Sequence, residues 1–284
     1  MTEYLRPTTL ADAIAARAAH PDWMVLAGGT DLMVNATHRP EPVGIVDLWG
    51  CAELRGVTRD RGAHPDRIRI GAGTPWLDVI ASADVVTGLP ILAAAAREIG
   101  ALQIQARGTI GGNIVTSSPV GDSLPVLLAL DASLELASPR GRRTVAYRDF
   151  CTGYRTTLLA ADELVAAVVI PVPDPATRLS WRKVGTRAAQ SISKVMAAAA
   201  IHVENGAIVW ARFGLGAVAA RPIRPAAAEA AATGRAPDAT TARAVADALA
   251  GEIKPISDVR SAADYRLEVA QRLLMRFVIN AGKP

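Results

Sequence analysis

The sequence predicts an α+β protein of two domains. Its 284 residues are 50% hydrophobic and 20% charged, as in ordinary globular chains, and this length suggests about two domains. Both segments with the period of a helix and segments with the two-residue period of a strand occur along the chain. Residues 171–175 contain three prolines, which can continue neither a helix nor a strand and so predict a linker. We therefore expect one domain over residues 1–172 and a second over residues 177–284.

The first hundred residues predict two helices and three strands. Thr9 precedes an amphipathic run over residues 10–17, and its hydroxyl suits a helix N-cap. A second helix is predicted over residues 89–100, where a glycine ends it. The strands are predicted at residues 24–27, 44–48 and 67–71. The first strand is short and apolar and runs directly into a glycine pair, which predicts a buried strand in a βαβ-like opening.

The rest of the chain predicts a strand-rich middle and a helical end. Residues 117–122 form a turn, and Asp122 is placed to cap a short apolar helix over residues 124–130. The expected later elements are strands at residues 133–137, 143–147, 163–171, 180–184 and 207–215, a basic hairpin turn at residues 140–143, and an alanine-rich helical tail with Asp238, Asp258 and Asp264 near helix starts.

Charge and cysteine content exclude several classes of protein. The chain has 31 Lys and Arg against 27 Asp and Glu, with no basic run of five, so no nucleic-acid partner is expected. A net charge of +4 does fit an anionic ligand or an acidic partner subunit. No apolar stretch resembles a membrane span or a signal peptide, so we expect a cytoplasmic protein. Cys51 and Cys151 are too few for a disulfide scaffold or a four-cysteine iron–sulfur site, and the four histidines lack metal-ligand spacing.

Two glycine pairs about eighty residues apart are the most informative feature of the chain. Gly28-Gly29 lies in residues 27–32, and Gly111-Gly112 lies in residues 109–113. Because glycine has no Cβ, backbone N–H groups beside it can approach a phosphate closely. Two such segments predict a diphosphate held from both sides. Neither is a P-loop, since no Gly-Lys-Ser/Thr follows.

Two further glycine segments do not predict a cofactor site. Residues 214–219 match the dinucleotide fingerprint G-x-G-x-x-A, but Pro222 and Pro225 interrupt the helix that should follow. No acidic residue stands at a strand end about twenty residues further on, which the fingerprint also requires. Residues 71–75, which end in Pro75, fail for the same reason.

The order and separation of the two glycine pairs resemble those of the FAD-binding subunits of the molybdenum hydroxylase family, which includes xanthine dehydrogenase and carbon monoxide dehydrogenase. The resemblance covers nearly the whole chain. It implies a two-subdomain FAD-binding fold of the PCMH type, with subdomains of about 1–55 and 56–172, followed by a small α/β C-terminal domain.

The resemblance also implies which residues contact FAD. Amides of residues 27–32 would hold the diphosphate, with Thr30 adding a hydroxyl, and residues 109–113 would close over the diphosphate and adjoining sugar chain. Asp122 would lie near the flavin, Val165 would make an apolar contact, and Lys183 would come from the C-terminal domain. Asp122 also suits a simple helix cap and Lys183 a surface lysine, and both possibilities stay open. No catalytic side chain and no metal ligand is expected, and the expected cofactor-binding residues are Ala27, Gly28, Gly29, Thr30, Asp31, Leu32, Thr109, Gly112, Asn113, Asp122, Val165 and Lys183.

What the family resemblance implies about activity is electron transfer. A molybdenum cofactor in a large subunit would hydroxylate the substrate, and two 2Fe-2S clusters in a small subunit would pass electrons to FAD on this chain, then to NAD⁺, a quinone or dioxygen. A dimer of such heterotrimers is expected. Residues 117–122 and 149–155 are most similar to bacterial xanthine dehydrogenase-type subunits, which ranks purines or other N-heterocycles before aldehydes and carbon monoxide last. Ile99 stands where animal xanthine dehydrogenases have an aromatic neighbour of the flavin, so NAD access and redox tuning are not carried over.

Two alternatives remain. A stand-alone FAD oxidase or reductase of the wider flavin fold often attaches its flavin through His or Cys, but neither glycine segment adjoins either residue. The tail of roughly a hundred residues is also small for a substrate domain. An assembly protein that has lost its flavin is the second alternative, and the intact glycine segments argue against it.

Overall fold

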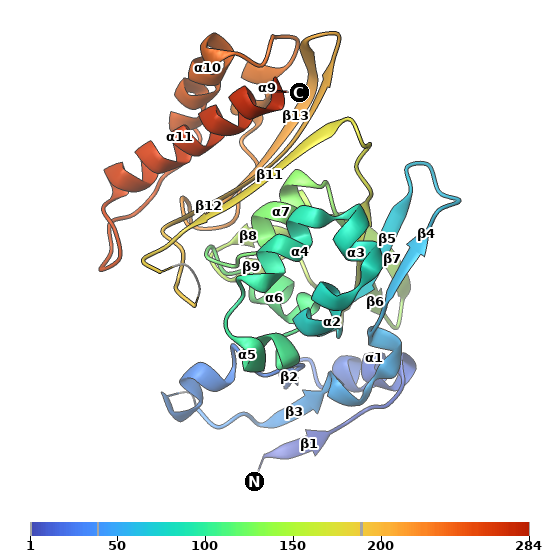
Figure 1. Ribbon diagram of the computed structural model, residues 1–284. Helices are drawn as coiled ribbons and strands as arrows, with labels where there is room; N and C mark the ends of the chain where they lie inside the picture. Colours follow the sequence, from blue (N-terminus) through green and yellow to red (C-terminus); the bar gives the residue numbers. More distant parts are fainter. Residues whose placement is uncertain (1, 39, 188–189, 284) are drawn as a thin grey trace.

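The computed structural model describes residues 2–38, 40–187 and 190–283. Its helices and strands fall into three successive groups along the chain, each built around a sheet (Figure 1). The N-terminal group lies at the bottom of Figure 1, and the helices of the C-terminal group lie at the top. Among the described residues, no helix has the length and apolar character needed to cross a membrane.

The N-terminal group is a small parallel sheet with one helix. Its strands are β1 (Glu3–Leu5), β2 (Met24–Leu26) and β3 (Gly44–Asp47), in the order β1-β3-β2. Helix α1 (Leu10–Ala19) connects the first two, and the Thr9 hydroxyl accepts a hydrogen bond from the amide of Asp12 at 3.1 Å. The predicted helix cap and βαβ-like opening are therefore confirmed. The expected burial of residues 24–27 is wrong: they are only half-buried, because one side of β2 faces a cavity.

The middle group surrounds a five-stranded antiparallel sheet. The strand order is β4 (Val57–Asp60), β5 (Arg67–Gly71), β10 (Leu164–Pro171), β6 (Ser133–Ser138) and β7 (Gly141–Ala146). The helices are α2 (Trp76–Ala81), α3 (Ala83–Gly88), α4 (Pro90–Arg97), α5 (Leu102–Arg107), α6 (Ile110–Thr116), α7 (Leu124–Ala129) and α8 (Tyr147–Phe150). A short hairpin of β8 (Cys151–Gly153) and β9 (Thr156–Thr157) completes the group. A hairpin turn does join β6 to β7, but it lies at residues 139–140, and residues 141–143 of the predicted turn belong to β7 instead.

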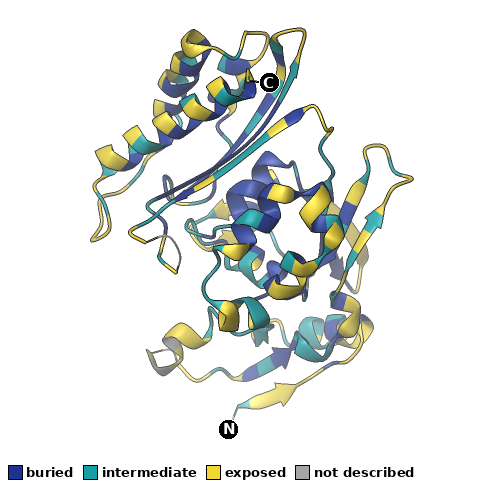
Figure 2. Cartoon of the chain, viewed as in Figure 1, coloured by how far each residue is buried: buried dark blue, intermediate teal, exposed yellow. Residues whose placement is uncertain are grey.

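The C-terminal group is a three-stranded antiparallel sheet with helices on one face. Its elements are β11 (Thr177–Val184), β12 (Val195–Glu204), β13 (Ala207–Gly216), α9 (Ala226–Ala232), α10 (Ala239–Ala250) and α11 (Ala263–Ala281). Helix α11 packs on one face of β12, and α7 of the middle group packs on the other. Figure 2 shows that β12 is buried along most of its length.

Three local expectations were wrong. Residues 109–113 do not form a loop, because α6 begins at Ile110. The helix predicted to end at Gly100 ends at Arg97, and Gly100 follows in a left-handed conformation with φ of 57°. Asp258 does not stand at a helix start, since α11 begins at Ala263.

Candidate cofactor-binding site

A cavity of about 720 Å³ lies between the N-terminal and middle groups. This volume falls within the range of roughly 300–1,000 Å³ that is typical of ligand sites. Both glycine segments, residues 27–32 and 109–113, contribute to its wall. Of the twelve residues expected to bind the cofactor, only Lys183 does not line it.

The first glycine segment presents free backbone donors to this cavity. It follows β2, and Gly29 takes a φ of 78°, which favours glycine. The amide of Met33 donates to the Gly29 carbonyl at 2.9 Å and so closes the segment into a turn. Within the described part of the chain, no protein acceptor receives a hydrogen bond from the amides of residues 28–32. A run of unsatisfied N–H groups on a cavity wall is suited to an anion.

The second glycine segment is different, because its backbone donors already have partners. The amide of Gly111 donates to the Ala72 carbonyl at 2.8 Å, and that of Gly112 donates to the Thr109 hydroxyl at 3.1 Å. The amide of Ile110 is likewise bonded to Thr74. The expectation of a second nest of free amides is therefore wrong. What Gly112 offers is space: a Cβ there would meet only the Thr109 hydroxyl, at 3.0 Å.

The two walls of the cavity touch through glycine. A Cβ on Gly28 would lie 1.8 Å from the carbonyl oxygen of Arg107, which no real structure tolerates. On the other side, a Cβ on Gly108 would lie 3.1 Å from the Thr30 hydroxyl. The absence of both side chains lets the segment after β2 pack directly on the connection between α5 and α6. Gly108 was not among the expected residues.

A buried ion pair lies behind one end of the cavity wall. Lys183 Nζ donates to Asp122 Oδ2 at 2.7 Å and to the Glu98 carbonyl at 3.3 Å, while the Ser193 hydroxyl donates to Asp122 Oδ1 at 2.9 Å. The side chains of Lys183 and Asp122 are only 4% and 12% exposed. Burial raises the pKa of Asp122, against the opposing effects of Lys183 and Ser193. The pair satisfies two charges that would otherwise be costly to bury.

This geometry decides between the alternatives left open by the sequence. Asp122 does not cap α7, because Ser123 occupies the N-cap position and the Asp122 carboxylate is engaged by Lys183 and Ser193. Lys183 is not a surface lysine, since it lies on β11 with its side chain enclosed. The C-terminal group therefore supports the cavity wall through Lys183, although Lys183 itself does not line the cavity.

Several lining residues were not anticipated from the sequence. Ala72 and Gly73 belong to the segment 71–75 that was set aside, and they do line the cavity. Pro75 does not break a helix there but precedes α2, which begins at Trp76. Other unanticipated lining residues include Arg17, Trp76 and Arg155, whereas Ile99, which the resemblance placed beside the flavin, also lines the cavity. Among these unanticipated residues, only Ala72 and Gly73 lie in a segment whose glycines could have indicated a cofactor site from the sequence.

As predicted, residues 214–219 do not form a dinucleotide-binding turn. Gly214 and Gly216 lie inside strand β13, and the next helix begins only at Ala226. A Cβ on Gly214 would lie 1.9 Å from the Pro125 carbonyl oxygen. Gly214 is therefore explained by the close packing of β13 on α7.

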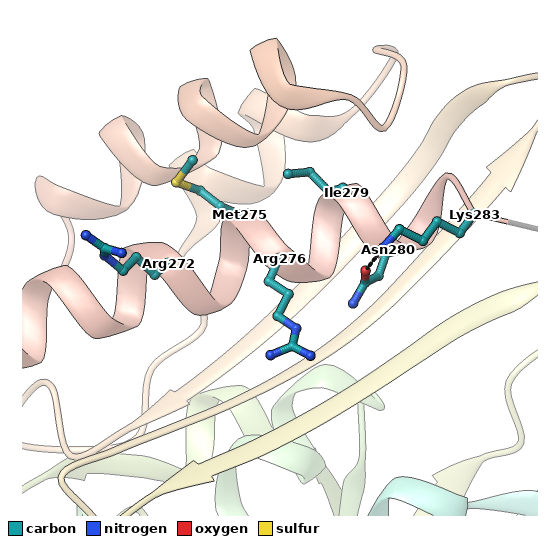
Figure 3. Close-up of a pocket in the computed structure, with 6 residues that line it drawn as sticks. All are labelled: Arg272, Met275, Arg276, Ile279, Asn280 and Lys283. Carbon is teal, nitrogen blue, oxygen red and sulfur yellow. Dashed lines mark hydrogen bonds between the residues drawn. The ribbon is translucent and has the colours of Figure 1, made fainter.

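A second hollow, of about 390 Å³, lies on α11 (Figure 3). It is lined by Arg272, Met275, Arg276, Ile279, Asn280 and Lys283. All six come from α11 or the two residues that follow it, and the close-up shows them spread along one helix rather than converging. A surface formed by one helix does not enclose a dinucleotide, so the cavity between the glycine segments is the better candidate.

Comparison with known families places both parts of the chain. Residues 1–173 match the family described as FAD binding domain in molybdopterin dehydrogenase. Residues 181–281 match the CO dehydrogenase flavoprotein C-terminal domain.

Individual relatives match over nearly their full length. The xanthine dehydrogenase FAD-binding subunit of Escherichia coli O157:H7 is 34% identical over 281 residues, covering 98% of this chain and 95% of the relative. The carbon monoxide dehydrogenase medium chain of Afipia carboxidovorans is 33% identical over 284 residues, covering 98% and 96%. The solved structure of reconstituted CO dehydrogenase from Oligotropha carboxidovorans superposes with a TM-score of 0.93 at 31% identity, covering 99% of this chain and 98% of that chain.

Proposed function

Because the chain belongs to the family of FAD-binding subunits of the molybdenum hydroxylases, we propose that the cavity between its two glycine segments holds FAD. The chain is an oxidoreductase subunit with an FAD-binding domain and a flavoprotein C-terminal domain. The observation that supports the location is the run of free amides at residues 28–32 on the wall of a cavity of about 720 Å³. The hollow on α11 is smaller, at about 390 Å³, and is formed by one helix and the residues after it.

The lining residues suit the diphosphate of this cofactor and supply an apolar contact. The amides of residues 28–32 and the Thr30 hydroxyl would hold the diphosphate by donating hydrogen bonds to it. The absence of a side chain on Gly112 leaves room beside that anion. Val165, on β10, supplies an apolar contact, and the Asp122–Lys183 pair supports the wall from behind. When bound, FAD accepts single electrons from iron–sulfur clusters and releases electron pairs to an acceptor.

The electron donors are proposed to reside on partner chains. Cys51 and Cys151 are both buried and unpaired, and a two-iron cluster commonly needs four cysteine ligands. Among the described residues, no group of three or more His, Cys, Asp or Glu side chains could hold a metal ion. We propose a small subunit with 2Fe-2S clusters, a large subunit with the molybdenum cofactor, and assembly as a dimer of heterotrimers in the cytoplasm.

In this proposal, the substrate of the assembled enzyme binds to the partner subunits and not to this chain. Relatives named for xanthine and for carbon monoxide are almost equally similar to this chain, at 34% and 33% identity, so similarity does not separate them. We rank purines and other N-heterocycles first, on the similarity of residues 117–122 and 149–155 to xanthine dehydrogenase-type subunits.

The proposal predicts FAD that is bound but not covalently attached. Neither glycine segment adjoins a His or Cys, so the cavity offers no attachment point there. Purified full-length chain should carry about one FAD, and acid precipitation should release all the yellow colour into the supernatant. Flavin retained by the washed pellet would show covalent attachment and favour the stand-alone oxidase. A colourless chain that takes up no added FAD would contradict the proposed function itself.

A further inference from the structure

One ion pair crosses the cavity from wall to wall. Five lining residues carry charged side chains: Arg17, Asp31, Asp122, Arg155 and Glu163. Asp122 is paired with Lys183 and Glu163 with Arg143, and neither partner lines the cavity. Asp31 and Arg155, by contrast, both line it and are paired with each other, although 124 residues separate them.

The two ends of this pair belong to different walls. Asp31 lies in the first glycine segment, beside the free amides. Arg155 stands at the tip of the β8–β9 hairpin. The Leu158 amide donates to the Phe150 carbonyl and closes the base of this hairpin, and the Ser117 hydroxyl, at the end of α6, donates to the Thr156 carbonyl and ties the hairpin to that helix. The side chains of Asp31 and Arg155 are 43% and 36% exposed, so the pair lies at the solvent side of the cavity.

The backbone at Arg155 is also unusual. Its φ of 53° lies in the left-handed region, which residues with a side chain enter at a cost. The neighbouring Tyr154 is 64% exposed, so burial of that side chain does not explain the turn. In this conformation the Arg155 side chain pairs with Asp31, which lines the same cavity.

We propose that Asp31 and Arg155 form a latch that closes the cavity over the cofactor and slows its release. This inference rests on the proposed function, because it takes FAD as the occupant. Asp31 alone would place a negative charge in the segment that receives the diphosphate, and Arg155 neutralises it. An exposed ion pair contributes little to stability, so it opens without disturbing the fold and still must open whenever the cofactor leaves.

The latch is tested by the rate of FAD release from the full-length chain, followed by timed ultrafiltration. Asp31→Asn and Arg155→Gln should each release FAD roughly two to five times faster than the wild type, the fold-change expected for one exposed pair. The double variant should be no faster than either single variant, because both remove the same interaction. Exchanging the charges, with Asp31→Arg and Arg155→Asp together, should restore the wild-type rate to within about twofold. Arg272→Gln, which breaks the exposed Arg272–Glu268 pair on α11, is the matched control and should release FAD as the wild type does.

Salt provides a second measurement that does not depend on the charge exchange. Raising the ionic strength should accelerate release from the wild type and leave both single variants almost unchanged. Wild-type rates in both single variants would overturn the latch. A faster Arg155→Gln beside an unchanged Asp31→Asn would also overturn it, because Arg155 would then act directly on the cofactor. These outcomes are distinct from failure of the proposed function, which appears as a wild-type chain that binds no FAD.

Discussion

Gly28 and Gly112, one from each glycine segment, serve opposite purposes. At Gly28 the missing side chain lets two parts of the protein touch, since a Cβ would lie 1.8 Å from the Arg107 carbonyl oxygen. At Gly112 the missing side chain leaves a free volume on the cavity wall, because a Cβ would meet only the Thr109 hydroxyl. Similar sequence patterns therefore reflect close packing of two segments of the chain in one case and room for a ligand in the other.

This difference predicts separable effects of substitution. Gly112→Val should abolish FAD binding with little change in the free energy of unfolding, because the branched side chain fills the space intended for the cofactor. Gly28→Ala should lose FAD and also destabilise the chain by about 1–3 kcal/mol, because the added methyl group forces the two walls apart. FAD content per chain and urea unfolding of the flavin-free proteins measure the two effects.

A matched control is Gly251→Ala, where a Cβ would meet only the Ala248 carbonyl oxygen at 3.6 Å. It should change neither quantity appreciably. Full flavin content in Gly112→Val would show that residues 109–113 form only a helix start and that the site assignment is wrong there.

At the scale of elements, α11 is fixed to its sheet by a buried arginine rather than by a helix cap. Ala262 occupies the N-cap position and offers no side-chain acceptor. Arg266, in the first turns, donates to the carbonyls of Lys194 and Ala217 at 2.9 and 3.2 Å and to Asp258 Oδ1 at 2.7 Å. The amide of Arg260 and the guanidinium groups of Arg266 and Arg260 lower the pKa of Asp258 from 3.8 to about 2.

The depressed pKa gives a pH-dependent prediction. Because the carboxylate is stabilised in the folded state, its contribution is complete well above pH 3.8 and is lost as the pH falls through about 2. Asp258→Asn should cost about 1–3 kcal/mol near neutral pH, since Arg266 loses a charged partner in a buried place. Urea unfolding at a series of pH values should show this difference shrinking between pH 4 and pH 2. Asp264→Asn, at the same end of α11 and without a contact to Arg266, should show no such change, and a pH-independent difference for Asp258→Asn would contradict the assignment.

The elements that could be predicted are those whose pattern is local. The strand at residues 67–71 alternates arginine with buried isoleucine as far as Ile70, and the helix after Thr9 carries its own cap, so both were found from the sequence. Strand β12 was missed because Ala197 to Ala200 give no two-residue alternation. The strand is covered on both faces, with Ala198 in the core of the middle group and Ala197 and Ala199 in that of the C-terminal group. Small side chains on both faces suit close packing by helices, which only the tertiary arrangement reveals.

The same limit applies to the site. The glycine segments were found because each carries its signal within a few residues, and both do line the cavity. The partners of Asp122 are Lys183 and Ser193, which lie 61 and 71 residues further along the chain, and the pairing of Asp31 with Arg155 spans 124 residues. Ion pairs between distant segments depend on the fold and have no spacing rule in the sequence.

At the scale of the whole molecule, two groups line the cavity and the third supports its wall. The N-terminal group supplies residues 27–32, and the middle group supplies residues 109–113 and Val165. The C-terminal group supplies Lys183 and Ser193, which hold Asp122 in place from behind. The matches to the two families cover these parts separately, at residues 1–173 and 181–281, yet the buried pair makes the cavity depend on both.

The described residues form a cavity for a flavin and no cluster of side chains that could hold a metal centre. The two cysteines are buried and unpaired, and no cluster of metal-ligating side chains is present there. The isolated full-length chain, loaded with FAD, should therefore be bleached by dithionite, because that reductant needs no protein partner. It should not be bleached by a purine or an aldehyde, because the centre that oxidises such a substrate is proposed to lie on a partner chain. Anaerobic absorbance spectra measure both reactions on one sample.

The complementary experiment is purification under gentle conditions from the native host. A complex that contains an iron–sulfur chain and a molybdenum chain should hydroxylate its organic substrate and bleach the flavin, and removal of the partners should abolish substrate-dependent bleaching but leave bleaching by dithionite. The contrast is informative because the FAD, its cavity and the surrounding chain are the same in both samples, so any difference must come from the partners. A lone chain that oxidises an organic substrate at a full rate would contradict the subunit role and favour a stand-alone flavin oxidase.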